Sequence, residues 1–577
     1  MKENNKFATI AIVIVLIIAI GGVGIWYFMS PKNTNINQES ATSTGGVKVE
    51  YSASELDSSW DEVSAVNIVF SSSEITSSDA SRVVVEGNVV TIKSAGEYHL
   101  TGESSDAQVI VEATKDDDVK LIFDNVNLKC SNSAPIFVKQ ADEVIITLAE
   151  GSNNTITDTT NYVLNEDEEP SAAIFSKEDL VINGTGTVTV TGNYEDGIVS
   201  KDDLKIISGT INVAAKDDAI RGKDSVVIKD GNLNIKSTGD AIKASNEDGD
   251  DVGYVVIDGG NIEISADDDG IHAESSLTVN GGKINIAKSY EGLEASNIVI
   301  NDGEICVISS DDGINVAGGN DGSGMMGRQN QNNANSSSSS SSHSLTINGG
   351  YIYVNATGDG LDSNGNAYMN GGTVIVNGPT NNGNGALDYD GTFDVNGGLL
   401  IAAGSSGMLQ TSSNNSKINC ISVTFDQSQQ AGSLISIQDS NGNEVVTFAP
   451  SKTYQSVVIC SADIKTGETY KVYSGGSSSK QEKNGLYENG GYSNGTLVTE
   501  LTVNSVVTTY GKGGMNGMQG GMKGNGMQQR DMPSDGSVLN GNMQDRNSQM
   551  QMPSNENMRN GNEQGGGVQK GPGARGR

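Results

Sequence analysis

The chain has 577 residues, a formal net charge of −36, 73 glycines and 5% aromatic residues. The negative charge argues against nucleic acid as a partner, because proteins bind phosphate groups with Lys and Arg. Few aromatics and many glycines do not suit a set of compact, aromatic-cored domains. They are typical of a repetitive β-structure, whose thin core takes small branched residues.

The first residues predict a membrane anchor. Lys2 and Lys6 precede an uncharged apolar run over 7–29, which exceeds the roughly 20 residues needed to span about 30 Å of hydrocarbon. The two lysines predict a cytoplasmic N-terminus. A cleaved signal peptide is the alternative, but the length of the run and the lack of a small-x-small site favour a retained single-pass anchor. Both interpretations place the bulk of the chain outside the cytoplasm.

Composition divides the chain into segments. We expect an N-terminal anchor over 1–30, a linker over 31–55, a β-helix over 56–410 with a flexible insertion over 318–343, a small C-terminal β-module over 411–510, and a disordered tail over 511–577. The tail is rich in Gly, Met, Asn and Gln, and cannot bury enough apolar area to offset its ordering entropy. Four cysteines do not form a disulfide framework, although Cys420 and Cys460 in the C-terminal β-region could pair.

A repeated turn is the first sign of an internal repeat. An apolar pair is followed by a glycine turn, as in VIDGG at Val256, TVNGG at Thr278 and TINGG at Thr346. Asn-Gly and Gly-Gly accept the positive φ that tight turns demand. A run such as NIEISA or KINIAK follows each turn, and its alternation of apolar and polar residues predicts a strand with one buried face.

An acid followed by Gly or Ala and an aliphatic residue is the second repeated feature. The acids are Asp196, Asp218, Asp240, Asp269, Glu291, Asp312 and Asp359, separated by 22, 22, 29, 22, 21 and 47 residues. The two long intervals contain insertions, NEDGDDVG and a serine-rich loop. The sequence therefore predicts an all-β fold, a right-handed parallel β-helix with about 22-residue rungs that stack at the strand spacing of about 4.8 Å. An antiparallel sandwich would not return the same acid at the same phase.

Stacked rungs would bring these acids into one column. Two carboxylates about 4.8 Å apart repel by roughly 0.9 kcal/mol in water and by about 3.5 kcal/mol at an effective dielectric of 20. The column must therefore be splayed into solvent, partly protonated or bridged by cations.

Calcium is the cation that suits such a column, because it takes six to eight oxygen ligands. The predicted ligands are the repeated acids together with three neighbours: Asp196, Asp217, Asp218, Asp240, Asp268, Asp269, Glu291, Asp311, Asp312 and Asp359. None of the three histidines falls in a spacing typical of transition-metal sites. The alternative is a solvated acidic edge that prevents association between sheets.

A polar row follows the acids at a distance of three residues. It runs Arg221, Lys243, His272, Glu294, Asn315, Asp362 and Asp388. Its basic end, Arg221, Lys243 and His272, could hold an elongated carbohydrate polymer that runs with the helix axis. Alternatively, these side chains neutralise the neighbouring carboxylates.

Several stretches resemble a known family. GEYHLTG, QVIVEA and DDDVKLIFDNVNLKCSNSAPIFVKQADEVIITLAEGSNNTITD, the repeated DGI and NGG turns, and VTFAPSKTYQSVVICSADIKTGETYKVYSGG resemble bacterial carbohydrate-binding domain-containing proteins. These are calcium-bearing β-helix proteins of the clostridial type that binds cellulose and polygalacturonate. The resemblance spans roughly residues 60–475. It implies polysaccharide binding, a fold related to that of pectate lyases, and calcium at the acidic turns, but it identifies no sugar-contacting residue.

We therefore expect a cell-surface, calcium-binding, non-catalytic protein that binds an extracellular polysaccharide of the cellulose or pectin class. The first alternative is a calcium-dependent pectate lyase-like enzyme, in which Ca²⁺ acidifies the α-proton of a uronate and a Lys or Arg removes it. Arg221 or Lys243 could serve as that base, although no cleft-forming loop singles out either one. The second alternative is a structural or adhesion protein of the cell surface.

Overall fold

The computed structural model describes residues 45–164, 169–249, 251–317 and 343–512. All of these belong to one compact unit, and apart from the short helix α2 (Ala53–Leu56) their regular structure is strand. No helix within the described ranges is long and apolar enough to cross a membrane. The predicted anchor over 1–30, the predicted insertion over 318–343 except its last residue, and the predicted tail over 511–577 except its first two residues lie outside the described residues, so those assignments stay predictions.

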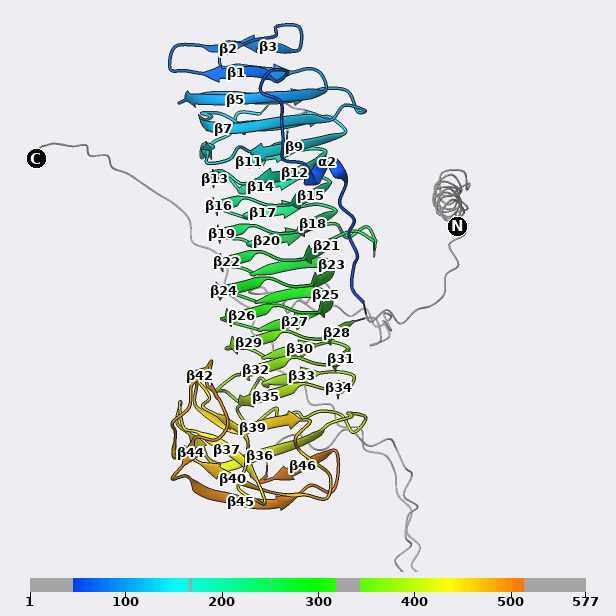
Figure 1. The fold of residues 1–577 in the computed structure, drawn as a ribbon, viewed down its shortest axis with the longest axis vertical. Helices are drawn as coiled ribbons and strands as arrows, with labels where there is room; N and C mark the ends of the chain where they lie inside the picture. Colours follow the sequence, from blue (N-terminus) through cyan, green and yellow to red (C-terminus); the bar gives the residue numbers. More distant parts are fainter. Residues whose placement is uncertain (1–44, 165–168, 250, 318–342, 513–577) are drawn as a thin grey trace, which may run out of the picture. The chain divides into compact units, whose positions relative to one another are not determined.

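Most strands stack in three columns, in which each strand pairs in parallel with the strand one turn later (Figure 1). Column 1 contains β4 (Val89–Ile92), β6 (Gln108–Glu112), β8 (Ile136–Gln140), β11 (Ala172–Ser176), β14 (Asp196–Ser200), β17 (Ile220–Gly222), β20 (Ile242–Ala244), the starts of β23 (Ile271–Val279) and β25 (Leu293–Ile300), β27 (Ile314–Val316), β30 (Leu361–Ser363) and β33 (Leu387–Tyr389). Column 2 contains β1 (Val66–Phe70), the starts of β5 (Gly96–Ser104) and β7 (Val119–Lys129), β9 (Glu143–Leu148), β12 (Asp179–Gly184), β15 (Asp203–Ile206), β18 (Ser225–Ile228), β21 (Tyr254–Ile257), the ends of β23 and β25, β28 (Ser344–Ile347), β31 (Asn366–Met369) and β34 (Phe393–Val395). Column 3 contains the ends of β5 and β7, β10 (Asn153–Thr157), β13 (Thr187–Gly192), β16 (Thr210–Ala215), β19 (Asn232–Lys236), β22 (Asn261–Ser265), β24 (Lys283–Ser289), β26 (Glu304–Ser309), β29 (Tyr351–Ala356), β32 (Thr373–Asn377) and β35 (Leu399–Gly404).

One strand per column makes one turn of a parallel β-helix, as the repeat predicted. In column 2, Leu204 pairs with Val226, which pairs with Val255 and then Leu277. The steps are 22, 29 and 22 residues, and the longer step contains the predicted insertion after Ser245. Parallel crossovers of this kind are right-handed in nearly all proteins, and the right-handed sense stays a prediction.

The core explains the motif of an acid, a small residue and an aliphatic residue. The aliphatic residues, such as Ile220, Ile242 and Leu293, are fully buried in the continuous interior of the coil. The residue after the acid is small because the next rung leaves little room for a side chain at this position. A Cβ on Gly292, for example, would lie 2.3 Å from the carbonyl oxygen of Gly313.

The glycine turns between columns 2 and 3 do more than reverse the chain. The last glycine of each turn has a positive φ, for example +89° at Gly282. The asparagine side chains of these turns also form a ladder, in which each amide nitrogen donates to the side-chain oxygen one rung earlier over 2.7–3.1 Å. The ladder runs through Asp258, Asn280, Asn301, Asn348, Asn370 and Asn396.

Antiparallel strands close both ends of the columns. At the N-terminal end, β2 (Ile75–Ser77) pairs with β1, and β3 (Val83–Glu86) pairs with β4. At the other end, β39 (Tyr454–Ser461) pairs antiparallel with β35 and with β36 (Asn419–Gln429), which pairs with β46 (Val507–Tyr510). Because an open strand edge invites association with other chains, this arrangement protects the ends of the coil.

The remaining C-terminal strands pack back against column 3. They are β37 (Ile435–Asp439), β38 (Glu444–Phe448), β40 (Thr469–Ser474), β41 (Ser477–Ser478), β42 (Glu482–Lys483), β43 (Leu486–Tyr487), β44 (Tyr492–Ser493) and β45 (Thr496–Thr502). Their buried side chains share a cluster with Ile375 and Ile401 of the coil. Lys483 lies over the ring of Tyr351, 3.9 Å from its centroid.

Cys420 and Cys460 lie directly opposite each other on β36 and β39, and both are buried, free thiols. The backbone N–H of Cys420 donates to Val506, on the side away from β39. The two cysteines therefore occupy a non-hydrogen-bonded pair, the closer of the two antiparallel pair types.

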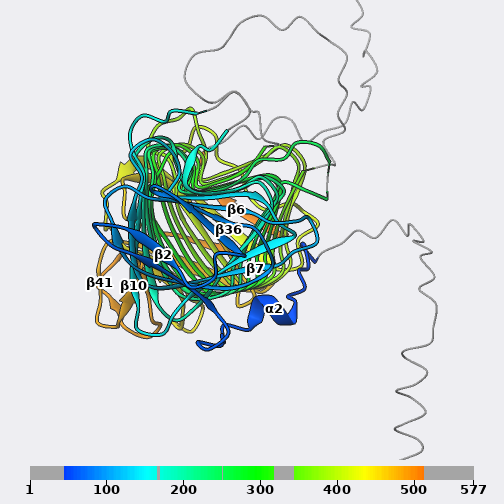
Figure 2. The same ribbon diagram turned by 90° about the horizontal axis from the view of Figure 1, so that it is seen from above.

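The described end of the predicted linker is a strap, residues 45–57, bonded along column 2. Tyr51 donates to Asp258 over 2.6 Å, and Asn183 donates to the carbonyl oxygen of Glu55 over 2.9 Å. Lys205 pairs with the Glu55 carboxylate at 2.5 Å. Figure 2 shows α2 outside the wall of stacked strands. The last part of the predicted linker over 31–55 is therefore bonded to the coil.

Candidate functional site

The repeated acids form one row along the turns between columns 3 and 1. In six steps of this row, one carboxylate oxygen accepts the backbone N–H of the residue at the same phase in the next rung, over 2.5–3.1 Å. The steps run from Asp196 to Asp218, Asp240, Asp269 and Glu291, and from Asp312 to Asp359 and Gly385. One oxygen of these carboxylates is thus used inside the fold, which leaves the other to contact side chains.

The polar row lies on the outer face of column 1, next to the acids. Its members are register partners: Arg221 pairs with Lys243, then His272, Glu294, Asn315, Asp362 and Asp388. The row changes from cations to carboxylates along the coil, and this change divides the site into three parts.

Cations neutralise the upper part of the acid row. Arg221 contacts Asp196 at 2.6 Å and Asp218 at 3.6 Å, and Lys243 contacts Asp240 at 2.6 Å. Burial works to lower the pKa of Lys243, but the charges of Asp240 and Asp218 outweigh it and hold that pKa above the ordinary lysine value. These contacts match the neutralising role that the sequence left open as an alternative to sugar binding.

A buried imidazolium occupies the middle part. Nδ1 of His272 lies 2.5 Å from Glu294 and 3.4 Å from Asp269, and Nε2 lies 3.4 Å from Glu274. Burial opposes the charged ring, yet the hydrogen bonds to Asp269, Glu274 and Glu294 raise the pKa of His272 to about 12. A ring that carries both protons has no lone pair for a metal ion.

The lower part contains carboxylates without a neighbouring cation. Among the described residues, no Lys, Arg or His forms an ion pair with Asp312, Asp359 or Asp362. Burial, followed by the charges of Asp359 and its neighbours, raises the pKa of Asp312 to about 8. Burial and the charges of Asp359 and Asp388 raise the pKa of Asp362 to about 7.

Three groups of side chains offer ligand atoms within 4.8 Å of one another. They are Asp240, Asp268 and Asp269; Asp269, His272 and Glu294; and Asp312, Asp359 and Asp362. Lys243 would compete with a metal ion for the first group, and the protonated His272 would compete with it for the second. The carboxylates of the third group are therefore the most accessible to a metal ion. Of the other predicted ligands, Asp217 is exposed, whereas Asp311 lies beside the third group.

Asp362 and Asp388 belong to this lower cluster, but the sequence placed them in the polar row and not among the metal ligands. The sequence did contain a sign of this role, because both residues are acids at the repeat position where earlier rungs carry cations. Gln410 donates to Asp388 over 2.6 Å, a contact that no repeat could predict because Gln410 lies beyond the last turn of the coil.

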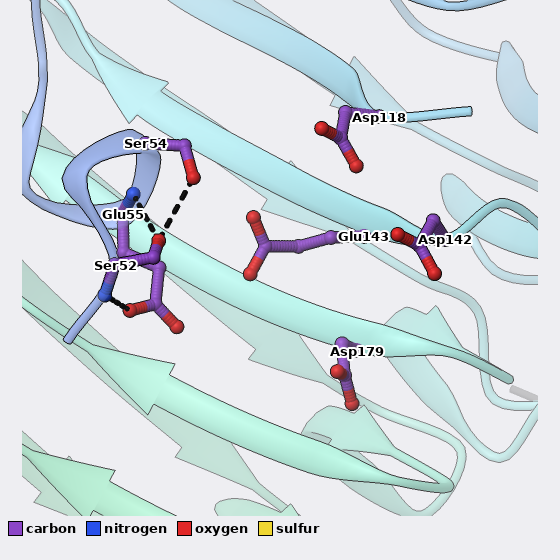
Figure 3. A pocket seen from close by; sticks show the side chains of 7 residues that line it. All are labelled: Ser52, Ser54, Glu55, Asp118, Asp142, Glu143 and Asp179. Carbon is purple, nitrogen blue, oxygen red and sulfur yellow. Dashed lines mark hydrogen bonds between the residues drawn. The ribbon is translucent and has the colours of Figure 1, made fainter. Parts of the chain in front are cut away.

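A separate acidic pocket of about 240 Å³ lies under the strap on column 2 (Figure 3). It is lined by Ser52, Ser54, Glu55, Asp118, Asp142, Glu143 and Asp179. Burial, then the charges of Glu55 and Asp118, raises the pKa of Glu143 to about 7. No three ligand atoms here meet the 4.8 Å spacing found on the acid row.

Comparisons with known proteins identify a family and two similar proteins. The family model described as carbohydrate-binding domain-containing protein matches residues 86–383, which is 298 of the 577 residues. A carbohydrate-binding domain-containing protein of Acetivibrio thermocellus is 36% identical over 150 residues, which cover 26% of this chain and 52% of that protein. The chain thus spans about half the length of that relative. A solved structure of a polysaccharide lyase-like protein from C. thermocellum, a gadolinium derivative, is 33% identical, with 41% of this chain and 93% of that chain covered and a TM-score of 0.38.

We predict that Lys243 stabilises the fold through its carboxylate partners. Lys243→Met should lower the free energy of unfolding by about 3 kcal/mol, because it leaves a buried carboxylate without its cation. The double variant Lys243→Met/Asp240→Asn should recover most of the loss, since asparagine keeps an oxygen for the backbone N–H of Asp269. Chemical denaturation measures both, with Lys216→Met, an exposed lysine, as the control. Equal stability of the Lys243→Met and Lys216→Met variants would contradict the ion-pair role.

A second prediction concerns pH and Glu143. Its folded-state pKa lies above the ordinary value, so the folded state holds the proton more tightly, and stability falls as pH rises from about 4.5 to about 7. Glu143→Gln should therefore melt about 1–2 °C higher than the parent at pH 8 and equally at pH 4. Glu112→Gln is the matched control, and it should lower the melting temperature at pH 8 instead of raising it. The reason is that the hydrogen bond from Lys93 lowers the pKa of Glu112. A Glu143→Gln gain that is the same at both pH values would refute this explanation.

Proposed function

The chain belongs to the family of carbohydrate-binding domain-containing proteins, and from this premise we propose that it is a calcium-binding, non-catalytic protein that binds an extracellular polysaccharide. The polymer is of the cellulose or pectin class. The apolar run over 7–29 holds the binding region at the outer side of the cell membrane.

The observation that carries the calcium part of the proposal is the change along the polar row from cations to carboxylates. Where Arg221 and Lys243 stand, the acids are neutralised by the protein itself. Where Asp362 and Asp388 stand, the same backbone geometry brings together carboxylates that form no ion pair with a cation of the described residues. A hard divalent ion with oxygen ligands suits Asp312, Asp359 and Asp362, with Asp311 and Asp388 nearby.

The state of the two candidate bases supports a binding role rather than a lyase. A general base needs a pKa near the working pH, yet the charges of Asp240 and Asp218 keep Lys243 protonated. Arg221 is held between Asp196 and Asp218. Both cations are occupied by the acid row, so neither is available to take a proton from a substrate.

We predict that calcium stabilises the protein at the lower acid cluster. Excess EDTA should lower the melting temperature by about 3 °C, since a ligand at 100 times its Kd stabilises by about 2.7 kcal/mol and a folded unit of this size loses about 1 °C per kcal/mol. Asp362→Asn should remove most of this response and should not destabilise the metal-free protein at pH 8, because it removes one of several repelling carboxylates. Asp251→Asn, which removes the same charge from an exposed loop, should respond to EDTA as the parent does.

An EDTA response that is absent from the parent, or undiminished in the Asp362→Asn variant, would refute the lower cluster as a calcium site. Direct calcium titration by calorimetry on the same proteins would distinguish a lost site from a site that binds without stabilising.

Polysaccharide binding is tested by sedimentation of the protein with insoluble cellulose and with calcium–polygalacturonate gel. We expect the protein in the pellet of at least one polymer and no increase in ultraviolet absorbance from unsaturated products. A protein that stays in every supernatant would reject the binding function and favour a structural role at the cell surface. Unsaturated uronate products would instead establish a lyase.

A further inference from the structure

The outer face of column 3 differs in chemistry from the rest of this acidic chain. On β10, β13, β16 and β19 the outward positions are threonine, asparagine and one alanine, and Lys236 is the single charged residue among these twelve positions. We refer to this surface as the threonine–asparagine face. In a chain with 72 acidic residues, a face over four successive rungs that carries no acid and a single lysine marks a surface suited to a neutral partner.

The polar groups of this face are free for a partner. Within the described ranges, the side chains of Thr189, Asn212, Asn232 and Asn234 make no hydrogen bond to another side chain, and Thr189, Asn232 and Asn234 are exposed. The acid row of column 1 is the opposite case, because its carboxylates are tied to backbone N–H groups and cations.

The face is also regular in two directions. Thr189, Asn212 and Asn234 are register partners on neighbouring rungs, so they repeat at the strand spacing of about 4.8 Å, while alternate residues along each strand repeat at about 6.7 Å. The C-terminal strands begin to cover column 3 further down, where Lys483 contacts Glu304 and Tyr351. In Figure 1, β13, β16 and β19 lie above β29 and β42, the strands that carry Tyr351 and Lys483.

We propose that the threonine–asparagine face is the carbohydrate-contacting surface and that it takes a neutral, hydroxyl-rich polysaccharide lying flat on the strands. This inference rests on the proposed carbohydrate-binding function and adds the face and the class of polymer. Amide and hydroxyl groups both donate and accept hydrogen bonds, which suits sugar hydroxyls. A polyuronate would meet the repulsion of a chain with a net charge of −36.

Because each hydrogen bond contributes little on its own, binding depends on many equivalent contacts. The triple variant Thr189→Ala/Asn212→Ala/Asn234→Ala should bind microcrystalline cellulose at least about tenfold more weakly than the parent, whereas Asn234→Ala alone should lose about threefold or less. Thr189→Glu/Asn234→Glu should also lose at least about tenfold. The matched control Thr496→Glu/Asn504→Glu places the same two charges on exposed C-terminal positions and should bind as the parent does.

The measurement is a depletion isotherm on microcrystalline cellulose, with a melting curve for each variant to establish that it is folded. If the parent binds cellulose and the folded triple and glutamate variants bind equally well, this face is not the contact surface, although the proposed function stands. Binding of the parent to calcium–polygalacturonate but not to cellulose would overturn the choice of a neutral polymer, while the proposed polysaccharide-binding function would stand. A parent that binds neither polymer would instead remove the proposed function.

Discussion

In-register stacking of the turns is the constraint on which the rest of this structure depends. Because each rung repeats the path of the previous one, every side chain lies beside its own equivalent at the strand spacing. An apolar residue gains a like neighbour in the core, as along Ile220, Ile242 and Ile271, whereas an acid gains a repelling one. The electrostatics of the acid row is thus a consequence of the fold. The carboxylates accept backbone N–H groups from the next rung, and the upper ones also contact cations of the polar row.

Much of this was readable from the sequence because a stacked coil turns three-dimensional contacts into a one-dimensional period. The spacing of Asp196, Asp218 and Asp240 predicted both the rung length and the shared face. The direction of each carboxylate was not predictable, since spacing says which residues align but not which atoms they contact. The asparagines of the glycine turns show the same limit. The Asn-Gly and Gly-Gly pairs predicted tight turns. The ladder of hydrogen bonds from Asn280 to Asn396 depends on how neighbouring turns superimpose, which the pairs do not indicate.

Contacts that break the repeat could not be predicted. Tyr51 and Asp258 are 207 residues apart, and no periodic pattern connects the strap with the coil. The sequence predicted a small C-terminal β-module, and Ile435–Asp439 and Tyr454–Ser461 in it are strands with mostly buried side chains. The sequence did not indicate that these side chains pack against Ile375 and Ile401 on the outside of column 3. Local pattern reports that a side chain is buried, and only the fold reports what it is buried against.

The outer faces of columns 1 and 3 therefore differ in how many of their polar groups remain free to bind a ligand, and in-register stacking is the reason. On column 1, repeated charge forces each group to find a partner within the protein, so little binding capacity remains except where the partners end, at Asp312, Asp359 and Asp362. On column 3, repeated threonine and asparagine cost nothing in repulsion, because neutral groups can align rung after rung without a neutralising neighbour. A linear polymer is itself a repeat, and a neutral one matches a neutral face with no ion between them. Under our two proposals, calcium on column 1 acts on the stability of the coil, and polysaccharide recognition on column 3 does not require calcium.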